Sequence, residues 1–167
     1  MPLRRLFVLL ALAVCALAHA DDYAEVQRLV HGGELPAALA RVEKASAADP
    51  GNARLRFLHA VILTDLQRDD EAMAIFQRLT QDYPELPEPY NNIALLYARA
   101  GQLDKARVAL ETALRNDPAQ TVARQNLGDI YLRLAIQSWE AVAKVVPGDL
   151  GLQRKLYLAR ELVNPAR

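Results

Sequence analysis

The chain has 167 residues, of which 52% are hydrophobic and 24% are charged, and its 20 basic residues balance its 20 acidic ones. Such a chain can bury a continuous core, and its composition is not that of a disordered protein. Because the charge is balanced and contains no cationic block, the sequence argues against a nucleic-acid partner and against an anionic membrane bound through bulk charge.

Residues 1–20 have the three features of a secretory signal peptide. Arg4-Arg5 gives a positive end, residues 6–17 form an apolar run, and residues 18–20 are a small-residue cleavage site. The apolar run is too short to span a bilayer. We therefore expect cleavage after Ala20 and export of residues 21–167 to a bacterial periplasm, without stable insertion in the membrane.

Two other export routes remain open at this stage. The Arg4-Arg5-Leu6-Phe7 segment is similar to a twin-arginine signal, but nothing later in the chain suggests a cofactor inserted before export, so ordinary secretion is favoured. Cys15 offers an outer-membrane lipoprotein as a minor alternative, although Val14 stands where lipidation requires a small residue. Cleavage after Ala20 also removes the only cysteine, and with it any disulfide or thiolate site.

Beyond residue 20, apolar residues recur at steps of three or four, the period of a helix, in short paired segments. The first segment, residues 21–31, turns at Gly32-Gly33, and Pro36 lies in the first turn of the next segment. A second pair follows, and three prolines within residues 84–89 fix the angle of its connection to the third pair. The sequence thus predicts helices that fold back on each other in pairs.

The third pair, residues 87–120, shows the pattern most clearly. Its first helix is predicted to end at Gly101 and its second at Asp117-Pro118. Their apolar stripes are Tyr90, Ile93, Ala94 and Tyr97, then Leu103, Ala106, Leu110, Ala113 and Leu114. Neither helix can bury its stripe alone, and the pair still leaves apolar edges that only further copies can cover.

Several sets of positions recur every 34 residues, and we call each set a column. The columns are Pro50, Pro84 and Pro118; Ala38, Ala72 and Ala106; Val42, Phe76 and Leu110; Ala45, Leu79 and Ala113; Leu29, Leu63 and Tyr97; and Gly33, Gln67 and Gly101 at the turn. Columns that keep one period indicate repeated structural units.

On these columns the chain resembles the tetratricopeptide repeat (TPR) family over residues 21–147. The column of the family's early Trp reads Asp22, Arg56, Tyr90 and Arg124, and the column of its glycine reads Val26, Ala60, Ala94 and Gly128. The resemblance implies an all-α, α-α superhelix that binds other proteins. One domain, residues 21–167, would hold repeats at about 19–52, 53–86, 87–120 and 121–148 and a capping helix at about 149–163.

The fourth repeat lacks its turn. Tyr131 and Ala135 are four residues apart, whereas the same two columns are nine apart in the other repeats, as from Tyr97 to Ala106. The five missing residues are those of the turn, and no Gly or Pro lies between Asp129 and Val146. We therefore predict one continuous helix over about 121–146.

A continuous helix cannot fold back on itself, so its face with Ala135, Trp139, Val142 and Val146 needs another cover. One candidate is the closing helix, whose apolar residues are Leu152, Leu156, Leu158 and Leu162. The other candidate is a second copy of the chain, which would make a homodimer through the fused helix.

No catalytic, cofactor or metal site is expected. His31 lies at a turn and His59 in a buried column, in different repeats, and the chain has no His-x-x-x-His pair, phosphate loop or GxSxG turn. The acidic residues 69–71 begin a helix, where negative charge is favoured, and so they indicate capping and no metal site.

The resemblance implies that the first helix of each repeat lines a concave groove for a peptide. By register these residues are Tyr23, Gln27, Arg54, Phe57, Leu58, Val61, Asn91, Asn92, Leu95, Gln125, Asn126 and Asp129. Asn92 and Asn126 share a column, and their amides suit the backbone of an extended peptide. The columns of the family's basic carboxylate clamp carry Phe57, Val61 and Val122, which argues against that type of receptor.

These observations favour a periplasmic scaffold that binds a peptide or protein of the cell envelope in its groove. The alternative is an obligate structural subunit of a cell-envelope assembly or secretion complex. An enzyme is not expected, because no convergent set of nucleophile, base and charge stabiliser is found.

Overall fold

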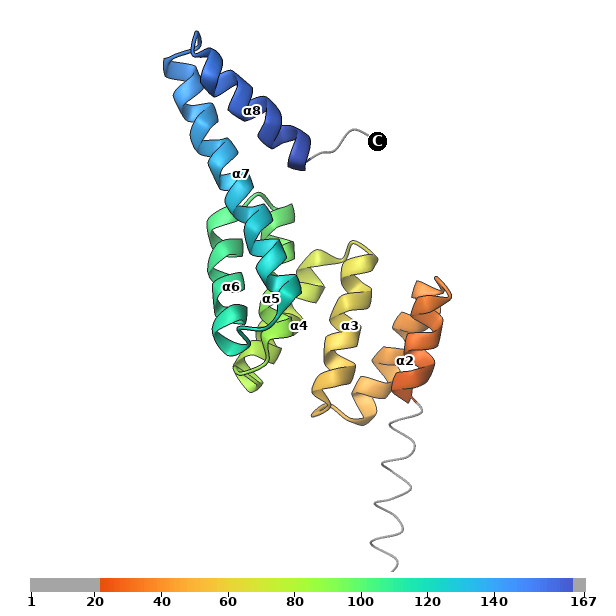
Figure 1. Cartoon of the computed structure of the whole chain (residues 1–167). Helices are drawn as coiled ribbons and strands as arrows, with labels where there is room; N and C mark the ends of the chain where they lie inside the picture. Colours follow the sequence, from red (N-terminus) through yellow and green to blue (C-terminus); the bar gives the residue numbers. More distant parts are fainter. Residues whose placement is uncertain (1–21, 164–167) are drawn as a thin grey trace, which may run out of the picture. The chain divides into compact units, whose positions relative to one another are not determined.

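The structure is a computed structural model that describes residues 22–163. The expected signal peptide and cleavage site therefore lie outside the described residues. Within them, every regular element is an α-helix (Figure 1). None of the helices in this part of the chain is both long and apolar enough to cross a membrane.

The helices belong to two compact units, one that ends at Tyr83 and one that begins at Pro84. Unit 1 contains a helix at residues 22–31, α2 (Leu35–Ala48), α3 (Ala53–Asp65) and α4 (Asp69–Asp82). Unit 2 contains α5 (Pro87–Arg99), α6 (Leu103–Asn116), α7 (Thr121–Val145) and α8 (Leu150–Val163). The all-α expectation is confirmed, and so is the fused helix, since α7 runs for 25 residues without a break.

The helices pack through the predicted columns. Ala38, Ala72 and Ala106 are completely buried, so paired helices approach closely at these small residues. The larger columns beside them form the cores of the two units and are buried as well: Val42, Phe76 and Leu110, and Ala45, Leu79 and Ala113. The 34-residue period is therefore the period of the buried side chains.

The turn column has a conformation that favours glycine. Gly33, Gln67 and Gly101 have φ angles of 75°, 62° and 72°. In each case the next residue donates its N–H back to the helix, as Arg68 does to the Leu63 carbonyl at 2.9 Å. This is the Schellman ending of a helix, which calls for a left-handed residue. Gln67 adopts that conformation with a side chain, which costs free energy that the glycines avoid.

In unit 2, α7 continues past the ends of α5 and α6, and α8 folds back along it (Figure 1). The closing helix is thus one cover of the projecting half, as expected, but its buried face differs from the expected one. Leu152, Leu156 and Ala159 are buried, whereas Leu158 and Leu162 are exposed. The reason is helical spacing, because residues 152, 156 and 159 lie on one side of a helix and 158 and 162 do not.

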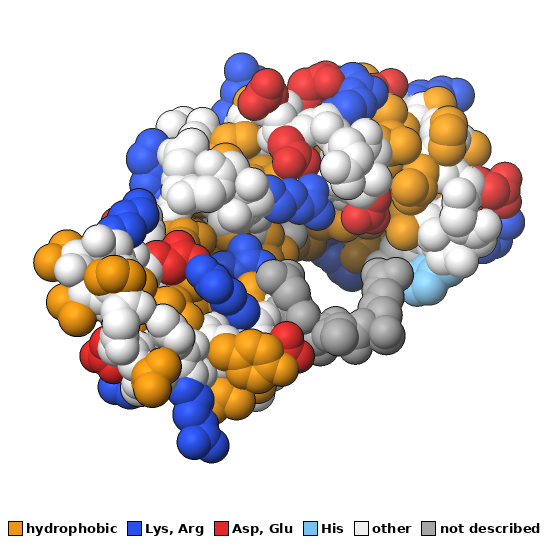
Figure 2. Space-filling model, turned by 90° about the horizontal axis from the view of Figure 1, so that it is seen from above, with side chains coloured by type: hydrophobic (Ala, Val, Ile, Leu, Met, Phe, Trp, Pro, Cys, Tyr) orange, Lys and Arg blue, Asp and Glu red, His pale blue; other side chains and the backbone are white. Residues whose placement is uncertain are grey.

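On the face drawn in Figure 2, hydrophobic side chains reach the surface among acidic and basic ones. The exposed large hydrophobic residues are most frequent near the end of the chain: Val142, Val145, Val146, Leu150, Tyr157, Leu158 and Leu162. Exposed apolar side chains that are frequent in one part of a chain are typical of an interaction site.

His59 is a half-buried histidine of α3, and burial lowers its pKa below the ordinary 6.5. The carboxylate of Glu43, whose Oε1 lies 4.0 Å from Nε2, acts in the opposite direction and only partly offsets the burial. Arg68 lowers the pKa further and Glu71 raises it. The neutral imidazole is therefore the form that the fold favours, in keeping with a core residue.

We expect Gln67→Gly to stabilise the protein by about 0.5–1 kcal/mol, because glycine adopts the left-handed conformation without the Cβ penalty, and its extra freedom in the unfolded chain offsets part of this gain. Gly101→Ala, which places a side chain at the same position of another turn, should lower the free energy of unfolding by about 1 kcal/mol. Urea unfolding followed by circular dichroism measures both. A lower stability for Gln67→Gly would show that the turn is not strained.

We also expect His59 to make the stability depend on pH. Since its folded-state pKa lies below that of the unfolded chain, the stabilisation is complete above pH 6.5 and is lost as the pH falls through the folded-state value. Between about pH 7.5 and about pH 5.5, the urea midpoint of the wild-type protein should therefore fall further than that of His59→Gln. Parallel pH curves for the two proteins would contradict this assignment.

Candidate functional site

In unit 1, the candidate groove residues of the first helix and of α3 lie together. Gln27 donates a hydrogen bond from Nε2 to the Tyr23 hydroxyl at 3.1 Å. The guanidinium of Arg54 lies over the Tyr23 ring, 4.5 Å from its centre. Tyr23 thus connects the two helices and presents one face to a cation, an arrangement that is favourable for arginine.

The other predicted residues of α3 belong more to the core than to a groove. The Phe57 ring packs on the Phe76 ring with centroids 5.6 Å apart and planes tilted by 60°. Val61 is half-buried, and Leu58 is buried. A ligand of unit 1 would therefore meet mainly Tyr23, Gln27 and Arg54.

In unit 2, two of the predicted amides bind each other. Asn126 on α7 donates from Nδ2 to the Asn91 Oδ1 on α5 at 2.8 Å. Asn91 is buried, so this bond satisfies a polar group inside the packing of the two helices. Asn92 donates to the Glu88 carbonyl of its own helix at 2.9 Å. Asn92 and Asn126 therefore each use one N–H of the side-chain amide within the protein, and the second N–H and the carbonyl oxygen are not used by these bonds.

A small hollow of about 80 Å³ lies beside this amide pair. Its apolar wall includes Leu95 and Ala98 of α5, and its polar wall is formed by Asn126, Asp129 and Arg133 of α7. Leu95 and Asp129 are exposed, and Gln125 is exposed nearby on α7. The hollow has room for one small apolar side chain, with polar groups on one side to orient the chain that carries it.

A larger hollow of about 660 Å³ adjoins it, since Ala98 and Arg133 line both. Its apolar lining includes Leu103, Ile136 and Val163. The rim carries Arg160 and Glu140, which form an ion pair between α8 and α7 with a 2.6 Å contact. The two hollows together make an elongated surface on unit 2 whose lining is partly apolar and carries charges of both signs.

Arg133 is the residue that the sequence reasoning missed. It lies one period after Arg99, on the first-helix register, so the 34-residue spacing was the signal that could have identified it. In the structure it is exposed and stands where the two hollows meet. A guanidinium there offers several donors to a carboxylate or to the carbonyls of a bound chain.

Among residues 22–163, no group of three or more His, Asp or Glu side chains is placed to hold a metal ion. Neither hollow has a histidine in its lining.

Comparison with known proteins agrees with this description. Two family models described as tetratricopeptide repeat match the chain, over residues 29–96 and over residues 87–120, which together make up more than half of its length. No curated protein matches the chain by sequence.

Several solved structures share its fold. The first TPR of Spaghetti (RPAP3) bound to the HSP90 peptide SRMEEVD is 19% identical with a TM-score of 0.65, over 70% of this chain and 93% of that one. The secretion chaperone SycD of Yersinia enterocolitica, in complex with a peptide of the translocator YopD, is 15% identical with a TM-score of 0.63, over 68% and 92%.

MamA is 18% identical with a TM-score of 0.61, over 86% of this chain and 81% of its own. Identities this low show a common fold and nothing further. The two family matches, the repeated columns and the helix pairs together identify the family: the chain is a tetratricopeptide repeat protein with an all-α superhelical fold.

Proposed function

We propose that this protein is an exported scaffold that binds an extended segment of another protein, and that its partner belongs to the cell envelope. The observation that carries the proposal is the pair of adjoining hollows on unit 2, with Leu95 and Ala98 on one side and Asn126, Asp129 and Arg133 on the other. An apolar hollow beside amides and a guanidinium suits a peptide with one anchoring apolar side chain and a neighbouring carboxylate.

Two similar structures support a peptide as the ligand. RPAP3 was solved with an HSP90 peptide and SycD with a peptide of YopD. Peptide binding on a TPR fold is thus a precedent for this chain, although the bound sequences themselves do not transfer at such low identity. The mixed charge of the hollows favours a ligand that combines apolar groups with charged ones over one bound by charge alone, and Arg133 is the group that would bind a carboxylate.

The exported location rests on residues 1–20. A positive end, an apolar run and a small-residue site are the signature of a secreted precursor. A periplasmic scaffold would then work without disulfides, since the only cysteine lies in the segment that is removed. The lipoprotein route through Cys15 is the alternative.

A second candidate function, a permanent subunit of an envelope assembly, is favoured by the exposed apolar residues of α7 and α8. We also propose that two copies associate through α7. Purification separates the candidates, because a free scaffold should be soluble without its partner, whereas an obligate subunit should aggregate without it.

The location predicts a processed chain. Mass spectrometry of the protein isolated from cell fractions should find an N-terminus at Asp21 in the periplasm. A lipidated Cys15 would assign the protein to a membrane surface, and an intact Met1 in the cytosol would rule out export.

The groove proposal predicts a specific loss of peptide binding. Panning a library of random linear peptides against the protein should enrich an apolar residue flanked by Asp or Glu. Leu95→Asp and Arg133→Glu should each weaken binding of the enriched peptides by about tenfold or more, because each removes a contact worth about 1.5 kcal/mol.

Arg154→Glu is the matched control for Arg133→Glu, since Arg154 is also an exposed arginine but lines neither hollow. It should leave binding unchanged, and circular dichroism should be the same for all variants. Equal binding by the wild-type protein, Leu95→Asp and Arg133→Glu would show that these hollows are not the peptide site.

A further inference from the structure

One helix, α7, carries both halves of a repeat. Its first half has the columns of a first helix, with Gly128 and Tyr131, and its second half has the columns of a second helix, with Ala135, Trp139 and Val142. In repeats 2 and 3 these two sets of columns face each other across a helix pair, α3 with α4 and α5 with α6. In α7 they lie on one continuous helix and cannot meet.

The columns of the first helix are open in α7. Ala60 and Ala94 are buried, but Gly128 of the same column is exposed, and a Cβ placed on it would meet no atom within 4 Å. Leu63 is buried, but Tyr131 of its column is 50% exposed. The surface that packs on a second helix in the earlier repeats is therefore uncovered here.

The columns of the second helix are open as well. Leu79 and Ala113 are buried, whereas Val142 of the same column is 48% exposed. Ala135 and Trp139 are only half-buried, although Ala106 and Leu110 of their columns are completely or almost completely buried. The two uncovered surfaces are therefore the ones that would pack on each other if repeat 4 had its turn.

The position of α8 supports this description. The buried residues of α7, which packs on α6, are Ala123 and Ile130. Adding 29 residues, which is one period of 34 less the five missing residues, gives Leu152 and Ala159, two of the three buried residues of α8. The closing helix therefore packs on the second half of α7 as α7 packs on α6. It takes the place of the next repeat's first helix. The side of α7 that would pack on a partner helix within the same repeat, as α5 packs on α6, stays uncovered.

The open residues form a continuous stripe along α7. Residues 124, 128, 131, 135, 139, 142 and 146 follow one another at steps of three or four, so they lie on one side of the helix. The first half of the stripe carries the columns of a first helix, and the second half carries the columns on which a first helix packs in a full repeat. Such a surface is complementary to itself about a two-fold axis.

We infer that two copies of the chain exchange the second halves of their α7 helices. The two α7 helices lie antiparallel, with Gly128 of each copy opposite Ala135 of the other. The residues of the same columns in repeat 3, Ala94 and Ala106, are buried in α5 and α6, which pack on each other. Each copy thereby completes the fourth repeat of the other. This inference rests on the self-association proposed above and is independent of the peptide site.

Charge along the stripe agrees with a second copy as the occupant. Arg124 is its only charged residue, and in this register it lies opposite Trp139 of the other copy, where an indole face attracts a guanidinium. Asp129, Arg133, Glu140 and Lys144 lie on other sides of α7, so no like charges meet across the axis.

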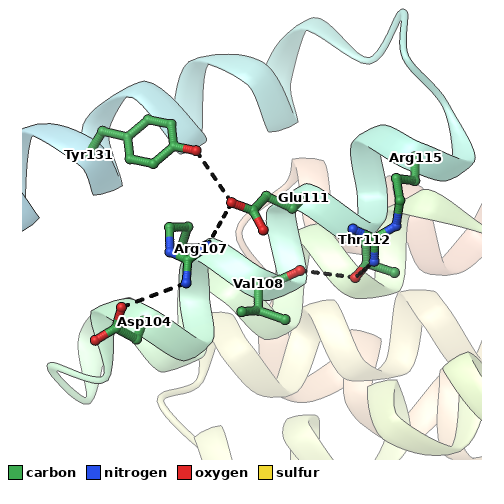
Figure 3. Close-up of polar contacts among 7 residues, drawn as sticks. All are labelled: Asp104, Arg107, Val108, Glu111, Thr112, Arg115 and Tyr131. Carbon is green, nitrogen blue, oxygen red and sulfur yellow. Dashed lines mark hydrogen bonds and ion pairs between the residues drawn. The ribbon is translucent and has the colours of Figure 1, made fainter.

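Tyr131 is already held in a suitable position near the axis. Figure 3 shows it reaching from α7 to α6, where its hydroxyl lies 3.3 Å from the Glu111 carboxylate. Glu111 in turn accepts a hydrogen bond from Arg107 at 2.8 Å. The phenol tip is thus satisfied within one copy, and the exposed ring remains for contact with the other.

Light scattering on the full chain should give twice the mass of one copy. Val142→Lys should shift the mass to that of a single chain, because in this register residue 142 lies beside the N-terminus of the other copy's α7 and beside its Arg124, where a further cation is unfavourable. Val108→Lys is the matched control, since Val108 lies on α6 and is 50% exposed, almost the same as Val142, but is not in the stripe. It should remain a dimer.

A second variant restores the turn. Inserting Gly-Asp-Tyr-Asp-Lys between Leu134 and Ala135 gives repeat 4 the spacing of the other repeats, so its second helix can fold back on its own first helix. This variant should be a folded monomer. It tests the exchange without placing a charge in a buried surface.

The register is tested by oxidation in a Cys15→Ser background. Gly128→Cys with Ala135→Cys should form a covalent dimer, because the two positions are about 10 Å apart along one helix, beyond the reach of a disulfide within a chain. Arg133→Cys with Glu140→Cys has the same spacing on another side of α7 and should not crosslink.

A monomeric wild-type protein would overturn both the self-association and the exchange. A wild-type dimer that persists in Val142→Lys and in the insertion variant would overturn the exchange and leave the self-association, which would then use another surface.

Discussion

A helix pair of this length cannot bury its own apolar surface, and the rest of the structure depends on that constraint. In each full repeat the small column lets the two helices approach, and the outer columns are covered only by the next helix along the chain. Ala106 and Leu110 are buried because α5 lies on one side of α6 and α7 on the other. Removing one turn therefore does more than shorten the protein, since it separates two surfaces that the remaining sequence still provides.

Much of this fold could be predicted from local features. Helix ends follow from Gly101 and Pro118, and the continuity of α7 follows from the lack of Gly and Pro over its second half. The face of α8 could not be predicted in this way, because the buried side of a terminal helix depends on its partner. Ala159 is buried and Leu162 is not, although leucine is the more hydrophobic. Counting 29 residues from Ile130 gives Ala159, so the register held information that hydrophobicity alone did not.

The candidate site shows the same division. The repeat register places Leu95, Asn126 and Asp129 on one surface, and the structure brings them together at the small hollow. The register does not show that Asn126 donates a hydrogen bond to Asn91, because that bond depends on how closely α5 and α7 approach. Nor does it show that Arg133 joins two hollows, since the larger one exists only because α8 folds back along a helix without a turn.

The two proposed surfaces of α7 do not compete. Asn126, Asp129 and Arg133 lie on the side of the helix away from Gly128, Tyr131 and Val142, because their positions differ by about half a turn. Exchange through the stripe would therefore leave the hollows free, and a dimer would hold two of them. For a partner with two binding segments, the second contact becomes intramolecular, so that modest hollows of this kind can hold it firmly without any new contact. The lost turn would then convert a short solenoid with one weak site into a bivalent scaffold.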